Sequence, residues 1–339
     1  MADLTPGELA AVAQELESNG VVTTGPLSAR VIAGGRSNLT YLIEDDVHQW
    51  VLRRPPTAGG TPSAHDVGRE FRVASALSAA GIPVPTPVLH SEDTSILGAH
   101  FTIVEFVAGV SLQSRDDIDA LDDSLMSSTV DHLVKTLAQL HSVDHHAAGL
   151  GSFGRSGEYA VRQLRRWSSQ WEIVGRNHEG LAPLLAQQLS ESVPRQSGSC
   201  VVHGDYRSDN ALIDLADAGR VLAIVDWELS TIGDPVADVA MMCAYRHPAF
   251  DSVVGFPAAW TSSRLPEPDA LATAYERAGD VSLTNWEFHM ALAYYKIAVI
   301  AAGIDHRYRA GGTVGRGFDQ AGDAVSSLVD AGLKVLRKR

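Results

Sequence analysis

The sequence has few cysteines and few basic residues, and both shortages narrow the functions open to it. Only two cysteines occur, Cys200 and Cys243, each inside an apolar run, so we interpret them as buried thiols and not as a disulfide framework. Lysine and arginine total 27 against 41 aspartates and glutamates, which gives a formal net charge of −14. A surface this acidic argues against nucleic acid as a partner, because phosphate contacts require clustered cations.

Long apolar runs are also missing. Residues 1–10 lack the basic start and apolar stretch of a signal peptide. The most apolar later segment, Ala291–Ile304, is shorter than a membrane span and carries Lys296 in its middle, so we expect a buried helix there. We therefore expect a cytoplasmic protein with no membrane partner. The sequence leaves the oligomeric state open.

What the chain does contain is enough apolar surface for two lobes that share a cleft. Its 339 residues are 45% hydrophobic and 20% charged, as in an ordinary folded protein. The first part shows short runs rich in β-branched and aromatic residues, with one helical pattern after the third run. The expected strands are Ala29–Ala33, Leu39–Ile43, Trp50–Arg54, Thr86–His90 and His100–Val107, and the expected helix is His65–Ala80.

Beyond these strands the helical period dominates. Helical patterns cover Tyr159–Glu172 and Leu181–Glu191, and helices are expected from Pro235 to the end, with a loop near Phe250–Leu265. Short strands return between positions 200 and 226. We therefore predict an α+β fold with two domains: residues 1–106 form a five-stranded sheet lobe with one key helix, and residues 107–339 form a larger, mostly helical lobe.

The strongest functional pattern lies between positions 201 and 226. The apolar run that starts at Val201 leads into a turn that carries Asp205, and Asn210 follows five residues later. A second apolar run, Val221–Val225, ends in Asp226. Two carboxylates and an amide at the ends of adjacent strands can converge on one point. Phosphoryl transfer from ATP requires such a set, because one carboxylate accepts the proton of the attacking hydroxyl and oxygen ligands hold Mg²⁺.

This block resembles the aminoglycoside phosphotransferase family, whose members are choline-kinase-like and share the protein-kinase-like fold. The motif residues are His203-Gly204-Asp205, Asn210, Asp226-Trp227-Glu228, Gly233-Asp234-Pro235 and Asp238. The segments 33–41, 51–56, 162–167 and 226–235 resemble, more narrowly, the branch that includes the kinase-like domains fused to acyl-CoA dehydrogenases. The resemblance runs through nearly the whole chain.

The resemblance implies a catalytic role for several of these residues. Asp205 would be the catalytic base. Asn210 and Asp226 would bind Mg²⁺, and Glu228 would contact a second metal ion or its waters. Arg207 would neutralise charge as the phosphoryl group moves.

The resemblance also implies that the sheet lobe holds the ATP. Arg53 stands where such folds place a lysine on the α- and β-phosphates, and Glu70 on the following helix would pair with it. Arginine suits phosphate oxygens, so we expect ATP binding to survive this replacement. Two further groups complete the expected nucleotide site: the turn over the phosphates, with Gly34, Gly35, Ser37 and Asn38, and the adenine hinge, from Glu105 to Val107.

Other polar residues near this block have structural interpretations. Asp238 is expected to support the catalytic loop through hydrogen bonds, and Asp234 to fix the turn before the next helix. His203 is expected to order the loop backbone. Three clustered histidines match no zinc signature and are interpreted as structural: His141, His145 and His146.

The phosphate acceptor is left open among small-molecule hydroxyl compounds. Arg162, Arg165 and Arg166 form either a solvated helix face or a basic lip for an anionic acceptor, and Trp167 is core or cleft wall. Polycationic aminoglycosides would suit the net charge of −14. The dehydrogenase-linked branch instead implies a hydroxyacyl thioester or a similar metabolite, and we favour this non-antibiotic acceptor.

Two functions from other classes remain as alternatives. A nucleotide-binding pseudokinase that serves as a sensor or scaffold is encouraged only by Arg53 in place of lysine. A protein-serine kinase is disfavoured because so few residues separate Asp226 from Asp238 that no activation segment fits between them.

Overall fold

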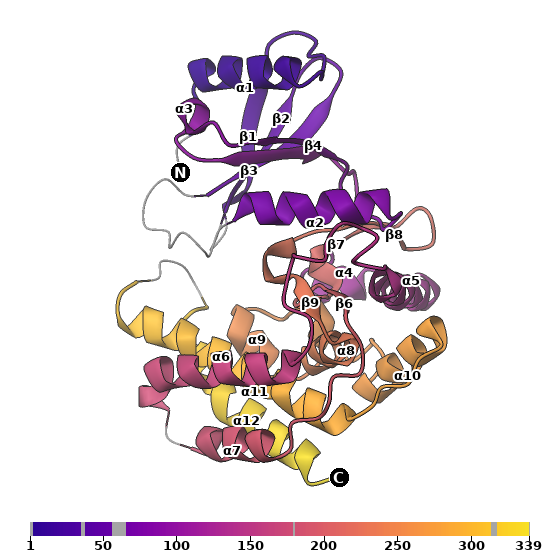
Figure 1. Ribbon diagram of the computed structural model, residues 1–339, viewed down its shortest axis with the longest axis vertical. Coiled ribbons are helices and arrows are strands. Elements are labelled where there is room, and N and C mark those ends of the chain that lie inside the picture. The colour runs from indigo at the N-terminus through magenta and orange to yellow at the C-terminus, as the bar shows by residue number, and fades with distance from the viewer. Residues whose placement is uncertain (1–2, 35–37, 56–65, 179, 313–316, 339) are drawn as a thin grey trace.

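The protein folds into two lobes, one built around a sheet and one mostly helical (Figure 1). The computed structural model describes residues 3–34, 38–55, 66–178, 180–312 and 317–338. The sheet lobe comes first in the chain, and the larger helical lobe lies below it in Figure 1. The predicted two-lobed α+β fold is confirmed.

The N-terminal lobe is one antiparallel sheet of five strands in the order β1-β2-β3-β5-β4. Helix α1 (Pro6–Ser18) covers one face, and α2 (Val67–Ala79) lies on the other, between the sheet and the second lobe (Figure 1). A short helix, α3 (Thr94–Leu97), joins β4 to β5. The strands are β1 (Ser28–Gly34), β2 (Leu39–Glu44), β3 (Gln49–Arg54), β4 (Pro87–Ser91) and β5 (Phe101–Glu105).

Side-chain alternation along β3 decides which residue faces which helix. Leu52 is fully buried in the apolar cluster that α1 covers, together with Tyr41 and Ile103. Because successive side chains of a strand point to opposite faces of the sheet, Arg53 points toward α2. The sheet therefore places one cation on the side that meets the second lobe.

The C-terminal lobe packs around α11 (Trp286–Arg309), whose central residues are buried. By length and composition α11 is the one described helix that passes for a membrane span, but 89% of its most apolar window is buried inside the protein. The buried helix expected around Lys296 is therefore present. The other helices of this lobe are α4 (Arg115–Asp119), α5 (Asp123–Ser142), α6 (Tyr159–Val174), α7 (Ala182–Glu191), α8 (Pro235–Ala244), α9 (Phe250–Val254), α10 (Pro268–Gly279) and α12 (Ala324–Leu336).

Two short pairs of antiparallel strands flank the turns in which Asp205, Asn210 and Asp226 lie. Strand β6 (Cys200–Val202) pairs with β9 (Thr231–Gly233), and β7 (Ala211–Asp214) pairs with β8 (Arg220–Ile224). The segment from His203 to Asn210 thus lies between β6 and β7, and Asp226 follows β8. Three-residue strands are too short to show a period, which is why β9 has no sequence signal.

Several predicted boundaries differ from the structure. The strand expected over His100–Val107 ends at Glu105, because the chain leaves the sheet there to enter the second lobe. The helix expected from His65 is described from Val67, with Asp66 as its N-cap, and His65 itself lies outside the described residues.

One predicted loop is wrong. The segment Phe250–Leu265 begins with helix α9, which stops at Gly255 in the left-handed conformation (φ +85°). It then contains a 3₁₀ turn over Ala259–Thr261. The helix is a single turn and a half long, so its apolar residues do not repeat often enough to reveal a helical period.

The sheet core yields a first prediction. Phe101 is fully buried in the α1-side cluster, so Phe101→Ala removes a ring and leaves a cavity. We expect a loss of about 3–5 kcal/mol in the free energy of unfolding. Val47, on the turn between β2 and β3, is 68% exposed, and Val47→Ala should change it by less than about 0.5 kcal/mol. Equal midpoints for both variants in urea unfolding would contradict the proposed core.

Candidate active site

The turn after β6 is held by one buried carboxylate. Asp238, 2% exposed in the first turn of α8, accepts backbone N–H bonds from His203 (2.7 Å) and Gly204 (2.8 Å). His141 Nε2 lies 3.2 Å from the same carboxylate. Burial opposes ionisation of Asp238, but hydrogen bonding from His141 and its neighbours holds its pKa below the usual value. The expected supporting role of Asp238 matches this geometry.

The turn can form only with glycine at position 204. Gly204 has φ +81°, and a Cβ placed there would lie 2.8 Å from the backbone oxygen of Leu229. Next to it, His203 orders the backbone as expected. Its Nδ1 accepts the Asp205 N–H (3.2 Å), and its Nε2 lies 3.0 Å from the Val225 carbonyl oxygen.

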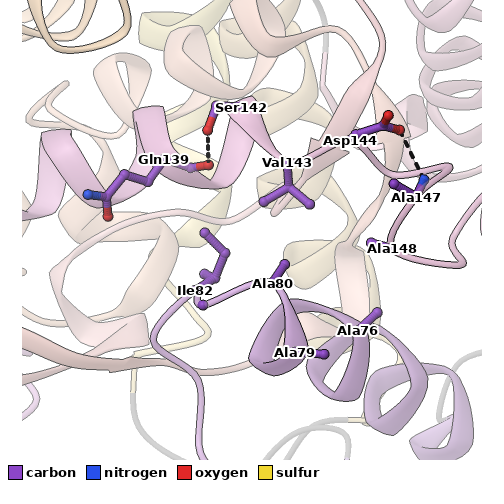
Figure 2. A pocket seen from close by; sticks show the side chains of 11 residues that line it. Ala76, Ala79, Ala80, Ile82, Gln139, Ser142, Val143, Asp144, Ala147 and Ala148 are labelled. Atoms are coloured by element: carbon purple, nitrogen blue, oxygen red, sulfur yellow. Dashed lines mark hydrogen bonds between the residues drawn. The ribbon is translucent and has the colours of Figure 1, made fainter.

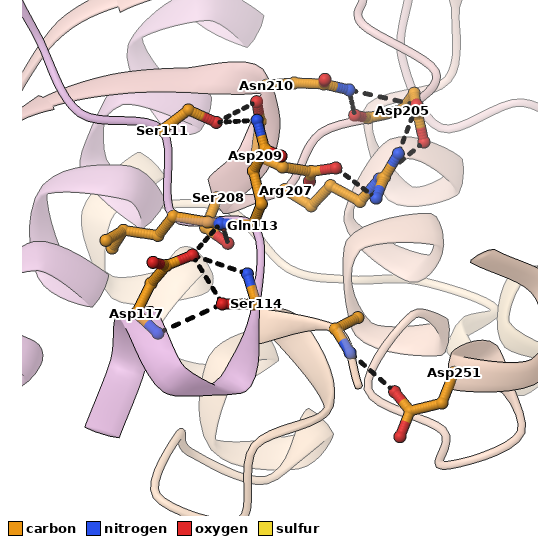
Figure 3. A network of polar contacts seen from close by, with 12 residues as sticks. Ser111, Gln113, Ser114, Asp117, Asp205, Arg207, Ser208, Asp209, Asn210 and Asp251 are labelled. Atoms are coloured by element: carbon orange, nitrogen blue, oxygen red, sulfur yellow. Dashed lines mark hydrogen bonds and ion pairs between the residues drawn. The ribbon is translucent and has the colours of Figure 1, made fainter. Parts of the chain in front are cut away.

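The Asp205 carboxylate is fixed from two sides (Figure 3). Arg207 approaches both of its oxygens, with Nε and Nη2 each at 3.2 Å. Asn210 Nδ2 donates to Asp205 Oδ2 at 3.1 Å and to the Asp205 backbone oxygen at 2.8 Å. Burial alone would raise the pKa of Asp205, but Arg207, Tyr245 and His203 together outweigh burial and hold that pKa below its usual range. Asp205 is therefore an ionised, oriented carboxylate at neutral pH.

Arg207 is itself shared between two acids. Its Nη1 lies 2.5 Å from Asp209 Oδ2, and its guanidinium stacks over the rings of Tyr245 and Phe250, 5.3 and 5.2 Å from their centroids. Burial raises the pKa of Asp209 to about 6 despite this contact. The positive charge of Arg207 therefore serves first to orient Asp205, and its role at a moving phosphoryl group stays a prediction.

Asp226 is brought to the same place by the β7–β8 hairpin. The Val225 N–H donates to the Asn210 backbone oxygen at 2.9 Å, so the residue after β8 lies beside the end of the catalytic loop. Asp226 adopts φ +66°, a conformation that few residues other than glycine, asparagine and aspartate accept. The structure thus brings Asp205, Asn210 and Asp226 to neighbouring backbone positions.

This donor set fits a hard cation. Asp226 Oδ1 is buried without a hydrogen-bond donor among the described residues, and the Asn210 amide nitrogen is already bound to Asp205, which leaves its amide oxygen for a metal. Carboxylate and amide oxygens are the ligands that Mg²⁺ takes together with phosphate oxygens. Among the described residues no cluster of three His, Cys, Asp or Glu side chains forms a closed metal cage. Such an open pair is typical of a metal that the substrate helps to hold.

The expected Arg53–Glu70 pair is present between β3 and α2. Arg53 Nη1 lies 3.1 Å from Glu70 Oε2, and Arg53 Nη2 lies 3.7 Å from Asp226 Oδ1. Asn38 Nδ2 donates to Glu70 Oε1 at 3.1 Å. Glu228, on the 3₁₀ turn after Asp226, contributes negative charge that acts on Glu70. One arginine therefore links the sheet lobe to the carboxylate that follows β8.

The remaining nucleotide residues follow the sheet edge. Gly34 ends β1, while Gly35 and Ser37 lie outside the described residues. At the hinge, the Glu105 N–H binds the Thr86 carbonyl (2.9 Å), and the Gly109 N–H binds the Val107 carbonyl (2.9 Å). The Phe106 N–H binds the Gln49 carbonyl (3.1 Å), and the contact of Glu105–Val107 with an adenine ring stays a prediction.

One arginine of the predicted basic lip on α6 makes hydrogen bonds within the protein. Arg162 donates to the carbonyl oxygens of Arg155 (2.7 Å) and Gly157, so it fastens the start of α6. Arg166 lies over the Trp167 ring, 5.2 Å from its centroid. The two arginines thus do not act as a pair, and of these two Arg166 is the one that lies beside the indole.

Comparison with known proteins identifies the family. A profile of the phosphotransferase enzyme family matches residues 28–288. The chain belongs to this family. The phosphotransferase is 36% identical over 315 residues to acyl-CoA dehydrogenase family member 10 of Mus musculus, a match that covers 92% of this chain and 29% of that protein. It is 31% identical over 329 residues to family member 11 of Homo sapiens, covering 96% and 42%. The chain therefore spans less than half the length of these relatives.

Solved structures show the same fold. A crystal structure of a candidate aminoglycoside phosphotransferase from Ralstonia eutropha matches with a TM-score of 0.81 and 29% identity, over 97% of both chains. A thermostable mutant of aminoglycoside phosphotransferase APH(4)-Ia, in complex with AMP-PNP and hygromycin B, matches with a TM-score of 0.62 and 15% identity, over 96% of this chain and 98% of that chain. At that identity the second match bears on fold alone.

Two residues of the phosphotransferase site escaped sequence reasoning. The Tyr245 hydroxyl, at the end of α8, hydrogen-bonds the Asp205 carboxylate. Lys296 Nζ, on α11, donates to the Gly204 carbonyl at 2.9 Å. Lys296 had a sequence signal, because a lone charge in an apolar helix needs a buried partner. Tyr245 had none.

A wide cavity of about 670 Å³ lies away from this site, between the end of α2 and the end of α5 (Figure 2). Small apolar side chains such as Ala76, Ala80 and Val143 line it, together with the edge of Asp144. It contains none of the predicted site residues.

The burial of Glu70 yields a pH prediction. Burial raises the pKa of Glu70 to about 7 against the opposing charge of Arg53. The folded state thus holds this proton more tightly than the unfolded chain, whose glutamates titrate near 4.5. The contribution of Glu70 to the free energy of unfolding is therefore complete below pH 4.5 and is lost as the pH rises to about 7. Without metal or nucleotide, Glu70→Gln should remove a decline of roughly 3 kcal/mol in unfolding free energy across this window.

Urea unfolding at pH 4.5, 5.5, 6.5 and 7.5 measures this effect. Glu92→Gln serves as the matched control, because Glu92 is exposed on the loop after β4. The control should keep the wild-type slope of stability against pH. A Glu70→Gln variant with that same slope would show that Glu70 does not titrate in this range.

Proposed function

We propose that this phosphotransferase moves the γ-phosphoryl group of ATP to a hydroxyl group of a small metabolite and requires Mg²⁺. The observation that carries the proposal is the ionised Asp205 carboxylate, held by Arg207 and Asn210 beside the turn of Asp226. An oriented carboxylate with no bound proton is a general base for a hydroxyl. The family match supports phosphoryl transfer as the reaction class.

Each of the site residues has its own role in the proposed reaction. The acceptor hydroxyl hydrogen-bonds Asp205, which takes its proton as the oxygen attacks the γ-phosphorus. The bond from the γ-phosphorus to the β,γ-bridging oxygen breaks, and ADP leaves with that oxygen. Asp226 and Asn210 would hold Mg²⁺, which when bound neutralises charge on the phosphate oxygens. Arg53, fixed by Glu70 and 3.7 Å from Asp226, suits the α- and β-phosphates. The Val107 N–H would meet the adenine ring.

We propose a non-antibiotic acceptor, such as a hydroxyacyl thioester or a similar metabolite. The relatives at 31–36% identity are acyl-CoA dehydrogenase family members. A small cavity is lined by the Lys296 ammonium, which donates to the carbonyl of Gly204, the residue before Asp205. An aminoglycoside acceptor remains the alternative, since a solved structure with the same fold is a complex with hygromycin B. A short stretch of twelve positions from Asp226 to Asp238, filled by a 3₁₀ turn, β9 and the start of α8, leaves no room for a protein-kinase activation segment.

Loss of the Asp205 carboxylate tests the proposal. Asp205→Asn should lower ATP-dependent phosphate transfer by at least roughly 10²–10⁴-fold while Mg-ATP binding persists, because general-base catalysis contributes that factor. The measurement is transfer of labelled γ-phosphate across a panel of hydroxyl compounds: hydroxyacyl thioesters, hydroxy acids, sugars, amino alcohols and aminoglycosides.

Asp131→Asn is the matched control, because Asp131 is exposed on α5. It should leave transfer unchanged. If the wild-type protein binds Mg-ATP but phosphorylates nothing in the panel, the result favours a nucleotide-binding scaffold over an enzyme.

A further inference from the structure

A narrow cavity between α6, α8 and α11 has a buried ammonium in its wall. Lys296 is 8% exposed and lines this cavity with Gln163 and Trp167 from α6 and His289 from its own helix. The remaining lining side chains, which include Met241 and Leu292, are mostly apolar. The volume of about 20 Å³ admits roughly one water-sized group, so only the polar tip of a ligand enters.

The Lys296 side chain connects this cavity to the turn that carries Asp205. Lys296 Nζ donates to the carbonyl oxygen of Gly204, the residue before Asp205. A lysine ammonium has three N–H donors, and this bond uses one of them. Trp167 Nε1 is bound to Gln163 Oε1 at 3.0 Å, so the indole donor is not directed to a ligand. Lys296 is therefore the strong donor at this end of the cavity.

A second cation, the exposed Arg166, lies near Lys296 outside the cavity lining. Lys296 Nζ lies 5.8 Å from the Trp167 ring centroid, and the Arg166 guanidinium lies 5.2 Å from the same centroid. Burial lowers the pKa of Lys296, and the Arg166 charge lowers it further, while Asp205 and Asp238 oppose this shift. Of the carboxylates that attract Lys296, Asp238 is already bound by two backbone N–H groups and His141, and Asp205 by Arg207. The carboxylates nearest Lys296 thus already have other hydrogen-bond donors. They compete less with an incoming anion for the Lys296 ammonium.

We propose that Lys296, with Arg166 and the Trp167 ring, forms an acceptor subsite that selects a negatively charged group, such as a carboxylate, and rejects an ammonium. The acceptor then spans the distance from Asp205, where its hydroxyl is deprotonated, to Lys296, where its anionic end binds. The inference rests on the proposed function and narrows it. It makes a polycationic aminoglycoside a poor acceptor in spite of the net charge of −14.

Three probes of one carbon skeleton test this charge preference: 3-hydroxybutyrate, 1,3-butanediol and 4-amino-2-butanol. Binding is measured by isothermal titration to protein saturated with Mg²⁺ and a non-hydrolysable ATP analogue. We expect the wild-type protein to bind the hydroxy acid at least about tenfold more tightly than the diol, and the amino alcohol most weakly. A hydrogen bond to a charged group corresponds to roughly ten- to a hundredfold in affinity.

Variants at position 296 separate recognition from folding. Lys296→Met should abolish the preference for the anion, and Lys296→Arg, which keeps the charge, should retain part of it. Lys135→Met is the matched control, because Lys135 is exposed on α5, and it should keep the wild-type order. Binding of the ATP analogue reports that each variant is folded. If Lys296→Met does not bind the ATP analogue, the anion preference of the Lys296→Arg variant tests the subsite instead.

The outcomes distinguish the subsite from the proposed reaction. A wild-type protein that binds the three probes equally, or binds none of them, overturns the subsite, as does an anion preference that Lys296→Met leaves intact. Transfer of phosphate is assayed separately with the same probes. An anion preference without transfer to any hydroxyl supports the subsite and contradicts the proposed function.

Discussion

The catalytic turn depends on one buried carboxylate. Asp238 accepts the backbone N–H groups of His203 and Gly204 at 2.7 and 2.8 Å, and these are the two residues that precede Asp205. Lys296 binds the Gly204 carbonyl from the opposite helix. The peptide groups before the catalytic base are thus fixed by a full negative and a full positive charge, which make stronger hydrogen bonds than neutral partners do. Helices α5, α8 and α11 can position the base only because these contacts are made.

A second ionic contact connects the lobes. Arg53 leaves the sheet toward α2, pairs with Glu70, and reaches to within 3.7 Å of Asp226 in the other lobe. The raised pKa of Glu70 shows that this acid is held where water does not compensate its charge. A cation shared by two carboxylates is also one that triphosphate oxygens can draw away from them. The nucleotide site that we propose and the contact between the lobes therefore use the same guanidinium.

The sequence predicted the site residues whose contact partners lie near them in the chain. Asp205 and Asn210 are five positions apart, and Asp226 follows a recognisable apolar strand, so the pattern shows that they can converge, and the family resemblance implies that they do. The two lobes were also predictable, since strand and helix periods separate near residue 106. Lys296 and Tyr245 were not, because their contacts with Gly204 and Asp205 cross 92 and 40 positions and depend on how helices pack. The sequence left Arg162 as either a solvated or a substrate-facing residue, because its actual partners are backbone carbonyls, which carry no signal in the sequence.

The central claim is that Asp226 and Asn210 share a metal ion beside the base Asp205. The most direct measurement is the anomalous diffraction of crystals grown with Mn²⁺ and a non-hydrolysable ATP analogue. The account predicts a peak within about 2.0–2.3 Å of an Asp226 oxygen and the Asn210 amide oxygen, with analogue phosphates completing its ligands and Asp205 facing the γ-phosphate. A peak bound elsewhere, or an analogue whose phosphates point away from Asp226, would contradict it.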